Sequence, residues 1–204
     1  MDRKALEDSL RFRHACKLFD ETKKIPRADL KFILEAGRLS PSSFGMEPWY
    51  LNVVQNRELK EALRPACWNQ AQITSCSDLL IITAKVDAPL RREYYEKMFA
   101  RREMPPEMLE RYLSVYRHYI DSLHSVYGWT ARQCYIAAAN MMSYAAMIGV
   151  DSCPIEGFEK ERVEEILGLD TNREQVALIV AFGYRVDEAP EKKRLDFDEV
   201  VRFL

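Results

Sequence analysis

Residues 129–150 read WTARQCYIAAANMMSYAAMIGV, and this stretch decides the fold. Its apolar side chains occur on every side of a helix, and small residues gather at 137–139 and 145–146. A helix that is apolar all round must be buried on every side, and its alanines allow neighbouring elements to approach closely. The stretch therefore predicts a central buried helix over about 129–148, ended by Gly149.

Two uncharged apolar runs predict the sheet on which this helix packs. Residues 79–84 read LLIITA and residues 176–182 read VALIVAF. Runs of this length are expected for central strands that are covered on both faces. A shorter β-rich run at 50–54 predicts another strand, and helices are predicted at about 3–11, 26–39 and 56–63 and from about 159. A sheet covered by helices in this way is an α+β layer arrangement.

A charged, aromatic-rich segment at about 88–128 separates the first apolar run from the central helix. Tyr, Met and Leu recur at helical intervals, and Pro105 and Pro106 interrupt them, so we expect two amphipathic helices that project as an arm. The arm shows no core of its own in the sequence, which favours a partner subunit as its cover. No repeat or linker divides the chain, so we expect one domain over 1–204.

Composition excludes several classes of protein. The 204 residues include 30 Lys and Arg against 32 Asp and Glu, a net charge of −2, which argues against nucleic-acid binding. The five cysteines and three histidines show no metal-site spacing, so no metal is expected. The charged N-terminus and the short apolar segments favour a cytoplasmic protein with no membrane span. The seven glycines form neither a dinucleotide-binding fingerprint nor a P-loop.

Four short stretches have residues suited to ligand binding. They read RHACKLFD at 13–20, SPSSFGMEPW at 40–49, PIEGF at 154–158 and KKR at 192–194. Arginine, histidine and lysine in the first could bind a phosphate. In the second and third, glycine and proline let backbone groups approach a flat ligand. Each stretch alone also fits an ordinary turn, loop or solvated surface.

Together and in this order, the four stretches and Asn69 resemble the FMN-dependent nitroreductase family, in particular its nitroimidazole-reducing members. That family typically shows R-H-S-x-K-x-F-D, S-P-S-S-x-N-x-Q-P-W, a helix with asparagine, P-I-E-G-F and K-x-R. The resemblance covers nearly the whole chain. It implies a three-layer nitroreductase-like α+β fold, in which helices pack on a central mixed, mostly antiparallel sheet. It also implies an intertwined homodimer with FMN at the subunit interface.

The resemblance further implies a role for each matching residue. The FMN phosphate would be held by Arg13, Lys192 and Arg194, with His14 near the ribityl chain and Ala15 beside it. The pyrimidine edge would be met by Lys17, Asn69 and Gln72. The ring would be lined by Pro41, Ser42, Ser43 and Gly45 of the other subunit and by Pro154, Ile155, Glu156 and Gly157 of the same one. The catalytic residues would be Lys17, whose charge stabilises reduced flavin, and Glu156, whose backbone amide faces flavin N5.

The activity implied is hydride transfer from NAD(P)H to nitroaromatic or quinone acceptors by a ping-pong mechanism. The sequence departs from the family pattern at Ala15, Gly45, Glu47 and Gln72, the last standing where many members have a second lysine. These departures keep open an alternative, a flavin-binding storage or sensing protein with little turnover. A structural helical dimer without flavin is a third possibility. The sequence leaves open NADH against NADPH and the identity of the acceptor.

Overall fold

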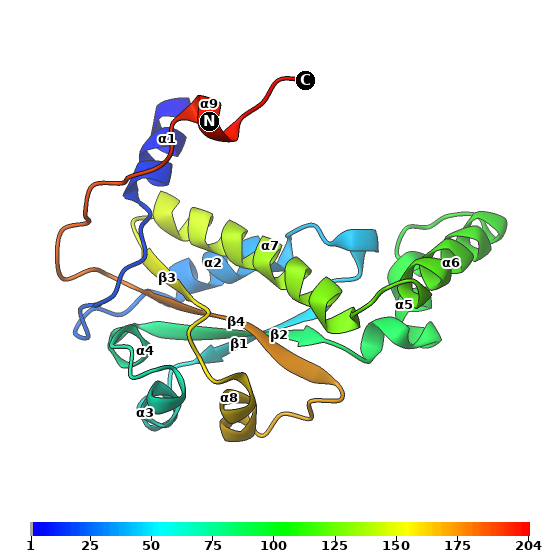
Figure 1. The fold of residues 1–204 in the computed structure, drawn as a ribbon, viewed down its shortest axis with the longest axis horizontal. Coiled ribbons are helices and arrows are strands. Elements are labelled where there is room, and N and C mark those ends of the chain that lie inside the picture. Colours follow the sequence, from blue (N-terminus) through cyan, green and yellow to red (C-terminus); the bar gives the residue numbers. More distant parts are fainter. Residues whose placement is uncertain (1) are drawn as a thin grey trace.

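The computed structural model describes residues 2–204 and has a four-stranded sheet at its centre (Figure 1). The strands are β1 (Trp49–Val54), β2 (Asp78–Lys85), β3 (Asp151–Ile155) and β4 (Glu174–Gly183), in the order β1-β2-β4-β3. All three neighbouring pairs are antiparallel, and a parallel bridge joins Ala15 to Ser152 at the β3 edge. The fold class predicted from the sequence is confirmed.

Helices cover both faces of the sheet and complete three layers. In Figure 1, α2 (Arg27–Arg38) and α7 (Val126–Met147) lie above the sheet, and α3 (Arg57–Ala66), α4 (Gln72–Ser75) and α8 (Lys160–Leu167) lie below it. Alternation along β2 feeds both layers, because Leu80 and Ile82 pack toward α7 whereas Leu79 and Ile81 pack toward α3 and α8. The remaining helices are α1 (Arg3–Phe12), η1 (Ser43–Gly45), η2 (Ala88–Leu90), α5 (Arg92–Ala100), α6 (Pro106–Asp121) and α9 (Phe197–Val200).

Local sequence signals place most of these elements within a few residues. The side chain of Asn56 caps α3 by accepting a hydrogen bond of 2.8 Å from the Leu59 N–H. Gly149 follows α7 with a φ of 75°, a conformation that glycine adopts without strain. Strand β3 was not predicted, because Pro154 and its neighbours have the composition of a turn. Proline is tolerated there because β3 is an edge strand.

The prediction that α7 is buried on every side is wrong for the single chain. Its apolar side chains Tyr135, Ile136, Tyr144 and Met147 are 39% to 44% exposed. The sheet and α2 cover only part of the helix circumference, and an all-apolar sequence does not specify what covers the rest. Among the helices found in residues 2–204, none has both the length and the apolar character needed to cross a bilayer.

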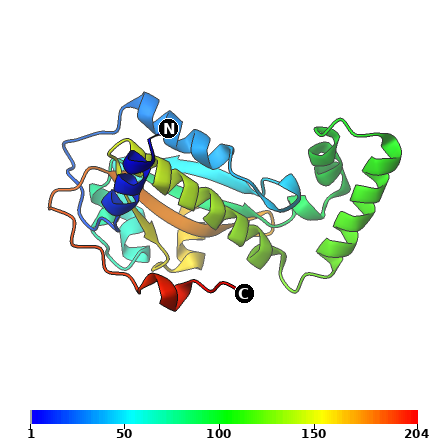
Figure 2. The same ribbon diagram turned by 90° about the horizontal axis from the view of Figure 1, so that it is seen from above.

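The arm contains two main helices, α5 and α6, as its periodicity predicts, and Figure 2 shows them projecting beyond the sheet. The expectation that the arm has no core of its own is wrong. Phe99 and Tyr116 are fully buried and pack with Trp129 of α7 and Met46 of the loop before β1. Two of these four residues lie outside the arm segment in sequence, which is why the segment alone shows no core.

This arm core predicts a large effect of truncation. Phe99→Ala should lower the free energy of unfolding by about 3 kcal/mol, because it leaves a cavity between α5 and α6. Urea unfolding followed by tryptophan fluorescence measures the change. The control Val115→Ala truncates a half-exposed α6 residue and should change stability by less than about 0.5 kcal/mol. Equal effects of the two variants would contradict a packed arm core.

Candidate functional site

The edge of β3 brings together three segments that are far apart in sequence. Residues 13–17 run along this edge, where the Cys16 N–H donates a hydrogen bond of 3.2 Å to the Ser152 carbonyl. This pairing places Lys17 beside Cys153, with 3.5 Å between Nζ and Sγ. Gln72, buried in α4, reaches the same sulfur with its Nε2 at 3.9 Å. The side chains of Lys17 and Gln72, both predicted at the pyrimidine edge, therefore contact the same sulfur atom.

Lys17 has an unusual electrostatic environment. Across residues 2–204 no carboxylate lies within 4.0 Å of its ammonium group, and its hydrogen-bond partner is the Cys153 thiol. Burial raises the pKa of that thiol, and the neighbouring Lys17 charge offsets part of the rise. The thiol is therefore held in its neutral form, and the Lys17 charge is available to an anion or a carbonyl oxygen.

Basic groups gather at the other end of the same segment. Lys192 donates hydrogen bonds from Nζ to the carbonyls of Leu10 and Arg13, which fastens the C-terminal segment to the end of α1. Burial and the charges of Arg13 and Arg194 lower the pKa of Lys192. Arg194 is exposed and donates to the adjacent Lys193 carbonyl at 2.6 Å. The structure thus brings the three residues predicted for phosphate binding into one positive cluster.

Between this cluster and Lys17 lie buried polar atoms without hydrogen-bond partners. Among them, within the chain as described, are Nδ1 of His14 and Oγ of Ser152. Asp151 lies 3.6 Å from the His14 ring but forms a 2.6 Å ion pair with Arg185. Burial, followed by the charge of Arg185, lowers the pKa of His14. A neutral histidine and an unpaired hydroxyl can bond a ligand's hydroxyl groups.

Residues 154–157 comprise the last two residues of β3 and the start of the turn after it, and they lie beside α7. The Ile155 side chain is buried in the core, so its backbone is the part that can face a ligand. The Glu156 carboxylate accepts a 2.7 Å hydrogen bond from the Tyr135 hydroxyl. Pro154 and Glu156 border a cavity of about 410 Å³, whose other walls are Tyr135, Ala138, Ala139, Met142 and Leu178. Sequence reasoning missed Tyr135, because no local signal links an α7 side chain to this turn.

Gly157 is required by a close approach of Trp68. A Cβ added at Gly157 would lie 2.7 Å from the Trp68 ring, a distance that real Cβ atoms do not show. The neighbouring Asn69 is exposed and lies in the connection between α3 and α4, with its carbonyl accepting from Arg64. Asn69 therefore lies on the loop that packs against the 154–157 turn.

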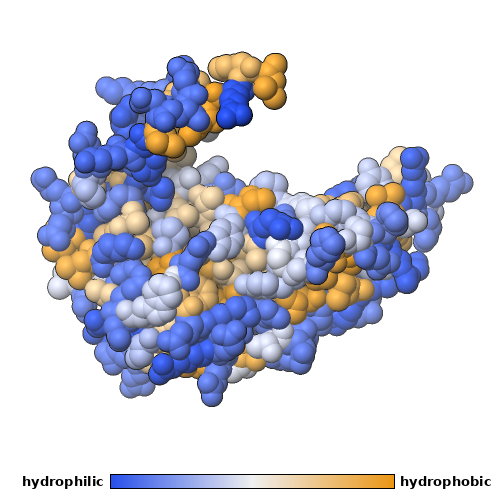
Figure 3. Space-filling model, in the orientation of Figure 1, coloured by the Kyte–Doolittle hydropathy of each residue, from blue (hydrophilic) through white to orange (hydrophobic). Residues whose placement is uncertain are grey.

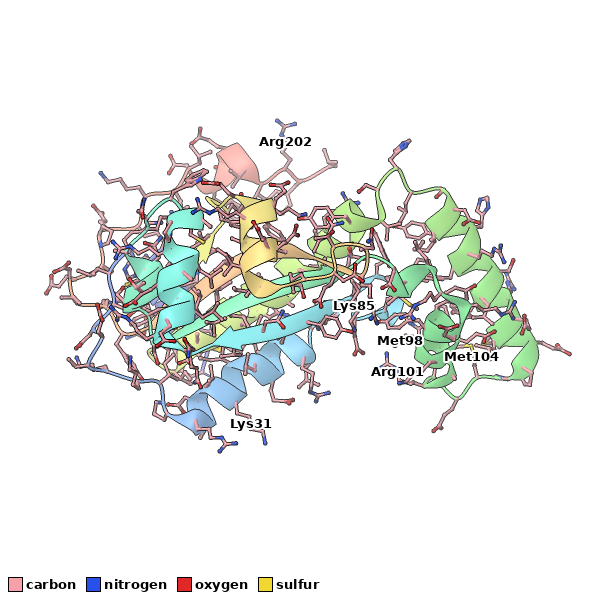
Figure 4. All side chains as sticks on the ribbon, turned by 90° about the horizontal axis from the view of Figure 1, so that it is seen from below. Lys31, Lys85, Met98, Arg101, Met104 and Arg202 are labelled. Carbon is pink, nitrogen blue, oxygen red and sulfur yellow. The ribbon has the colours of Figure 1, made fainter. Side chains whose placement is uncertain are left out.

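The predicted residues Pro41, Ser42, Ser43 and Gly45 lie elsewhere in the chain. The Ser43 N–H donates to Oε1 of Gln133 near the start of α7, at 2.9 Å, whereas Arg13 lines a cavity with Ser143 and Met147 at its end. Gln133 and Ser143 are separated by roughly 15 Å along a helix. Figure 4 labels Arg101, whose guanidinium donates to the Gly45 carbonyl, at the base of the arm. One chain therefore keeps this group of residues apart from the others.

Backbone strain concentrates in the predicted stretches. Five residues other than glycine have a positive φ within 2–204: Phe44, Glu47, Trp68, Asn69 and Glu103. Four of them belong to the stretches 40–49 and 67–70, which the sequence resemblance assigns to a ligand site. Strained residues persist where surrounding contacts hold them, commonly at binding sites. Within the same residues no three His, Cys, Asp or Glu side chains group as metal ligands.

Comparisons with known proteins identify relatives of this chain in sequence and in fold. The profile of the Nitroreductase family matches residues 10–184. The Bacillus subtilis (strain 168) protein YfkO, named provisionally as an NAD(P)H nitroreductase, is 40% identical over 212 residues, covering 97% of this chain and 96% of YfkO. A Staphylococcus epidermidis crystal structure, described provisionally as an NAD(P)H:FMN oxidoreductase, is 30% identical with a TM-score of 0.83, covering 98% of this chain and 95% of that one. A complex with FMN from Exiguobacterium sibiricum, a provisional nitroreductase, shares the fold at 23% identity and a TM-score of 0.84, covering 100% of this chain and 98% of that one.

The environment of His14 predicts a pH dependence of stability. Because the pKa of His14 is lower in the folded chain than in the unfolded one, the unfolded chain binds the proton first as pH falls below about 6.5. The free energy of unfolding should therefore decrease between about pH 7 and pH 5. His14→Gln should reduce that decrease, as measured by urea unfolding without added ligand. The control His118→Gln, exposed on α6, should keep the pH dependence of the parent protein.

Proposed function

This chain belongs to the nitroreductase family, and we propose that it is a homodimeric FMN-dependent oxidoreductase. It passes hydride from NAD(P)H to nitroaromatic or quinone acceptors by a ping-pong mechanism. The observation that carries this proposal is the ammonium group of Lys17, which meets no carboxylate of residues 2–204 and lies on the same β3 edge as the positive cluster of Arg13, Lys192 and Arg194. These charges suit a ligand with a phosphate at one end and a carbonyl edge at the other.

The polar groups of the site match the chemical groups of FMN. The positive cluster suits its phosphate. The unpartnered His14 and Ser152 atoms suit the hydroxyls of its ribityl chain, and Lys17 suits the oxygen at its pyrimidine edge. When bound, FMN supplies the reversible acceptance and delivery of hydride that no side chain can provide.

The residues of this chain would tune and orient that chemistry. Lys17 would stabilise negative charge at the pyrimidine edge, and the buried Gln72 would contribute a neutral amide there. The Glu156 N–H has no acceptor among the described residues, so it is free to donate to a ligand. The Glu156 carboxylate is occupied by Tyr135, so the backbone of this residue, rather than its side chain, would meet FMN.

A second copy of the chain would complete the site. Residues 41–45 contact α7 through Gln133, ten residues before the Ser143 that lines a cavity with Arg13, so we propose that they reach the β3 edge from another protomer. The exposed apolar face of α7 offers a surface for that contact, and its burial would stabilise the pair. Figure 3 shows the C-terminal segment standing away from the body above a hollow. Phe203 and Leu204, the last two residues of that segment, are apolar and exposed. We propose that the partner subunit fills this hollow.

Anaerobic titration tests the function. Purified protein should be yellow, and NADH or NADPH should bleach its flavin absorbance. Nitroaromatic or quinone compounds should then restore the absorbance, and steady-state double-reciprocal plots should be parallel. Protein that stays yellow with either nicotinamide would instead select the storage or sensing alternative. Protein that cannot take up FMN would refute both.

Removing the Lys17 charge should slow reduction of the flavin more than it weakens the binding of FMN. Lys17→Gln should lower the flavin midpoint potential and slow flavin reduction by NAD(P)H about tenfold or more. Spectroelectrochemistry and anaerobic stopped-flow absorbance measure the two effects. The matched control is Lys31→Gln, because Lys31 projects from the outer side of α2 (Figure 4) and should leave both values unchanged. An unaltered potential in Lys17→Gln would contradict the proposed role.

Disrupting the α7 face should abolish FMN binding at a distance. Ile136→Glu places a charge on the exposed apolar face, so it should shift the protein from dimer to monomer with little cost to the single chain. Sedimentation velocity would report the mass, and flavin fluorescence the loss of FMN affinity. Glu161→Gln, a charge change on the exposed side of α8, serves as the control. A monomer that retains full FMN affinity would exclude a site shared between subunits.

A further inference from the structure

Gln70 holds the turn that follows β3. Its Nε2 donates to the Gly157 carbonyl at 2.8 Å and to the Cys67 carbonyl at 3.0 Å. Its Oε1 accepts from Nε2 of Gln72 at 2.8 Å. The amide therefore makes three hydrogen bonds, and both its donor and its acceptor atoms are used.

The sheet does not fix the turn by itself. Strand β3 ends at Ile155, and the chain beyond it is tied to the α3–α4 region instead. The Glu159 N–H donates to the Ala66 carbonyl at 2.8 Å, and Gln70 holds Gly157 from the same side. The Trp68 ring packs against Gly157 where a Cβ would stand. The position of residues 156–158 thus depends on the loop at 67–70.

That loop is itself held in a strained form. Trp68 and Asn69 both have a φ of 55°, although neither is glycine. The Asn69 N–H donates to the Arg64 carbonyl at 3.0 Å, and the Gln70 N–H donates to the Cys67 carbonyl at 3.2 Å. Two consecutive left-handed residues reverse the chain after α3 and carry Gln70 to Gly157. Strain of this kind persists where the surrounding contacts over-determine the backbone.

Gln70 also links the turn to Lys17. From the Gly157 carbonyl, contacts pass through Gln70 to Gln72, whose Nε2 lies 3.9 Å from the Cys153 sulfur. The Lys17 ammonium lies 3.5 Å from the same sulfur. Three side chains, those of Gln70, Gln72 and Cys153, therefore connect the Lys17 charge to the carbonyl of Gly157, the residue that follows Glu156.

We infer that Gln70 is a positioning residue that fixes the Glu156 amide relative to Lys17. It governs the rate of hydride transfer to the flavin more than the affinity for FMN. The inference rests on the proposed function. Positioning within a fraction of an ångström controls hydride transfer steeply, whereas FMN affinity is spread over the phosphate, ribityl and ring contacts.

Two substitutions at Gln70 distinguish the effect of its hydrogen bonds from the effect of its size. Gln70→Leu keeps the approximate size and removes the hydrogen bonds. Gln70→Glu keeps the acceptor for Gln72 but cannot donate to Gly157 while it is ionised. When protonated, it can donate again. The control Gln175→Leu removes a glutamine that bonds Thr171 and Lys160 and, within residues 2–204, forms no side-chain hydrogen bond with the 67–70 loop or with residues 156–158.

The first measurement is the anaerobic rate of flavin reduction by NAD(P)H, beside the Kd for FMN. Gln70→Leu should slow reduction about tenfold while raising the Kd less than about threefold. Gln70→Glu should be slow near about pH 8 and should regain part of the parent rate as the pH falls toward the ordinary glutamic acid pKa of about 4.3, whereas Gln70→Leu should not recover. Parallel losses of reduction rate and FMN affinity would overturn the inference, and so would unchanged reduction in both variants.

The second measurement does not depend on activity. Hydrogen–deuterium exchange at residues 156–158 of flavin-free protein should be faster in Gln70→Leu than in the parent and in Gln175→Leu. Equal exchange in all three proteins would contradict the inference that the hydrogen bonds of Gln70 hold residues 156–158 in place. If the parent protein is not reduced by NAD(P)H, the proposed function fails while this exchange result still reports on those hydrogen bonds. If the parent is reduced and the Gln70 variants match it, the inference fails alone.

Discussion

The pairing of residues 13–17 with the edge of β3 is the constraint on which the candidate site depends. One backbone hydrogen bond, from Cys16 to Ser152, and the adjacent bridge at Ala15 align the two segments. An open strand edge is a hazard for aggregation, and this segment covers it. The same alignment brings the Lys17 ammonium into contact with the Cys153 sulfur and places Arg13 just after α1. The same pairing thus covers the strand edge and brings the residues of the candidate site together.

Charge along this edge is arranged so that it stays positive. The nearest buried acid, Asp151, is neutralised by Arg185 at 2.6 Å and does not compensate Lys17 or Lys192. Unpaired cations are costly when buried, so the chain leaves Lys17 and Arg194 exposed and uses backbone carbonyls to hold Lys192. Preorganised charge of this kind stabilises a bound anion without further rearrangement of the protein.

The separation of residues 41–45 from the β3 edge gives α7 a double role. One side of the helix packs on β2 and β4, and the other side is apolar and exposed. The helix also spaces the two groups of site residues, with Gln133 near one and Ser143 near the other. An arrangement in which two copies meet through α7 would bring complementary groups together. The arm, in contrast, has its own small core and does not need a partner to be packed.

The sequence by itself determined the elements whose signals are local. Apolar runs indicated β2 and β4, Asn56 indicated the start of α3, and Gly149 indicated the end of α7, because periodicity and capping act over a few residues. The ordered motifs also predicted which residues form the candidate site. Tertiary structure alone decided that Pro154 lies in a strand, that Trp129 and Met46 complete the arm core, and that Gln70 and Tyr135 hold the turn. Those outcomes depend on contacts between distant residues, such as the 87 positions between Gln70 and Gly157, which only the folded topology brings together.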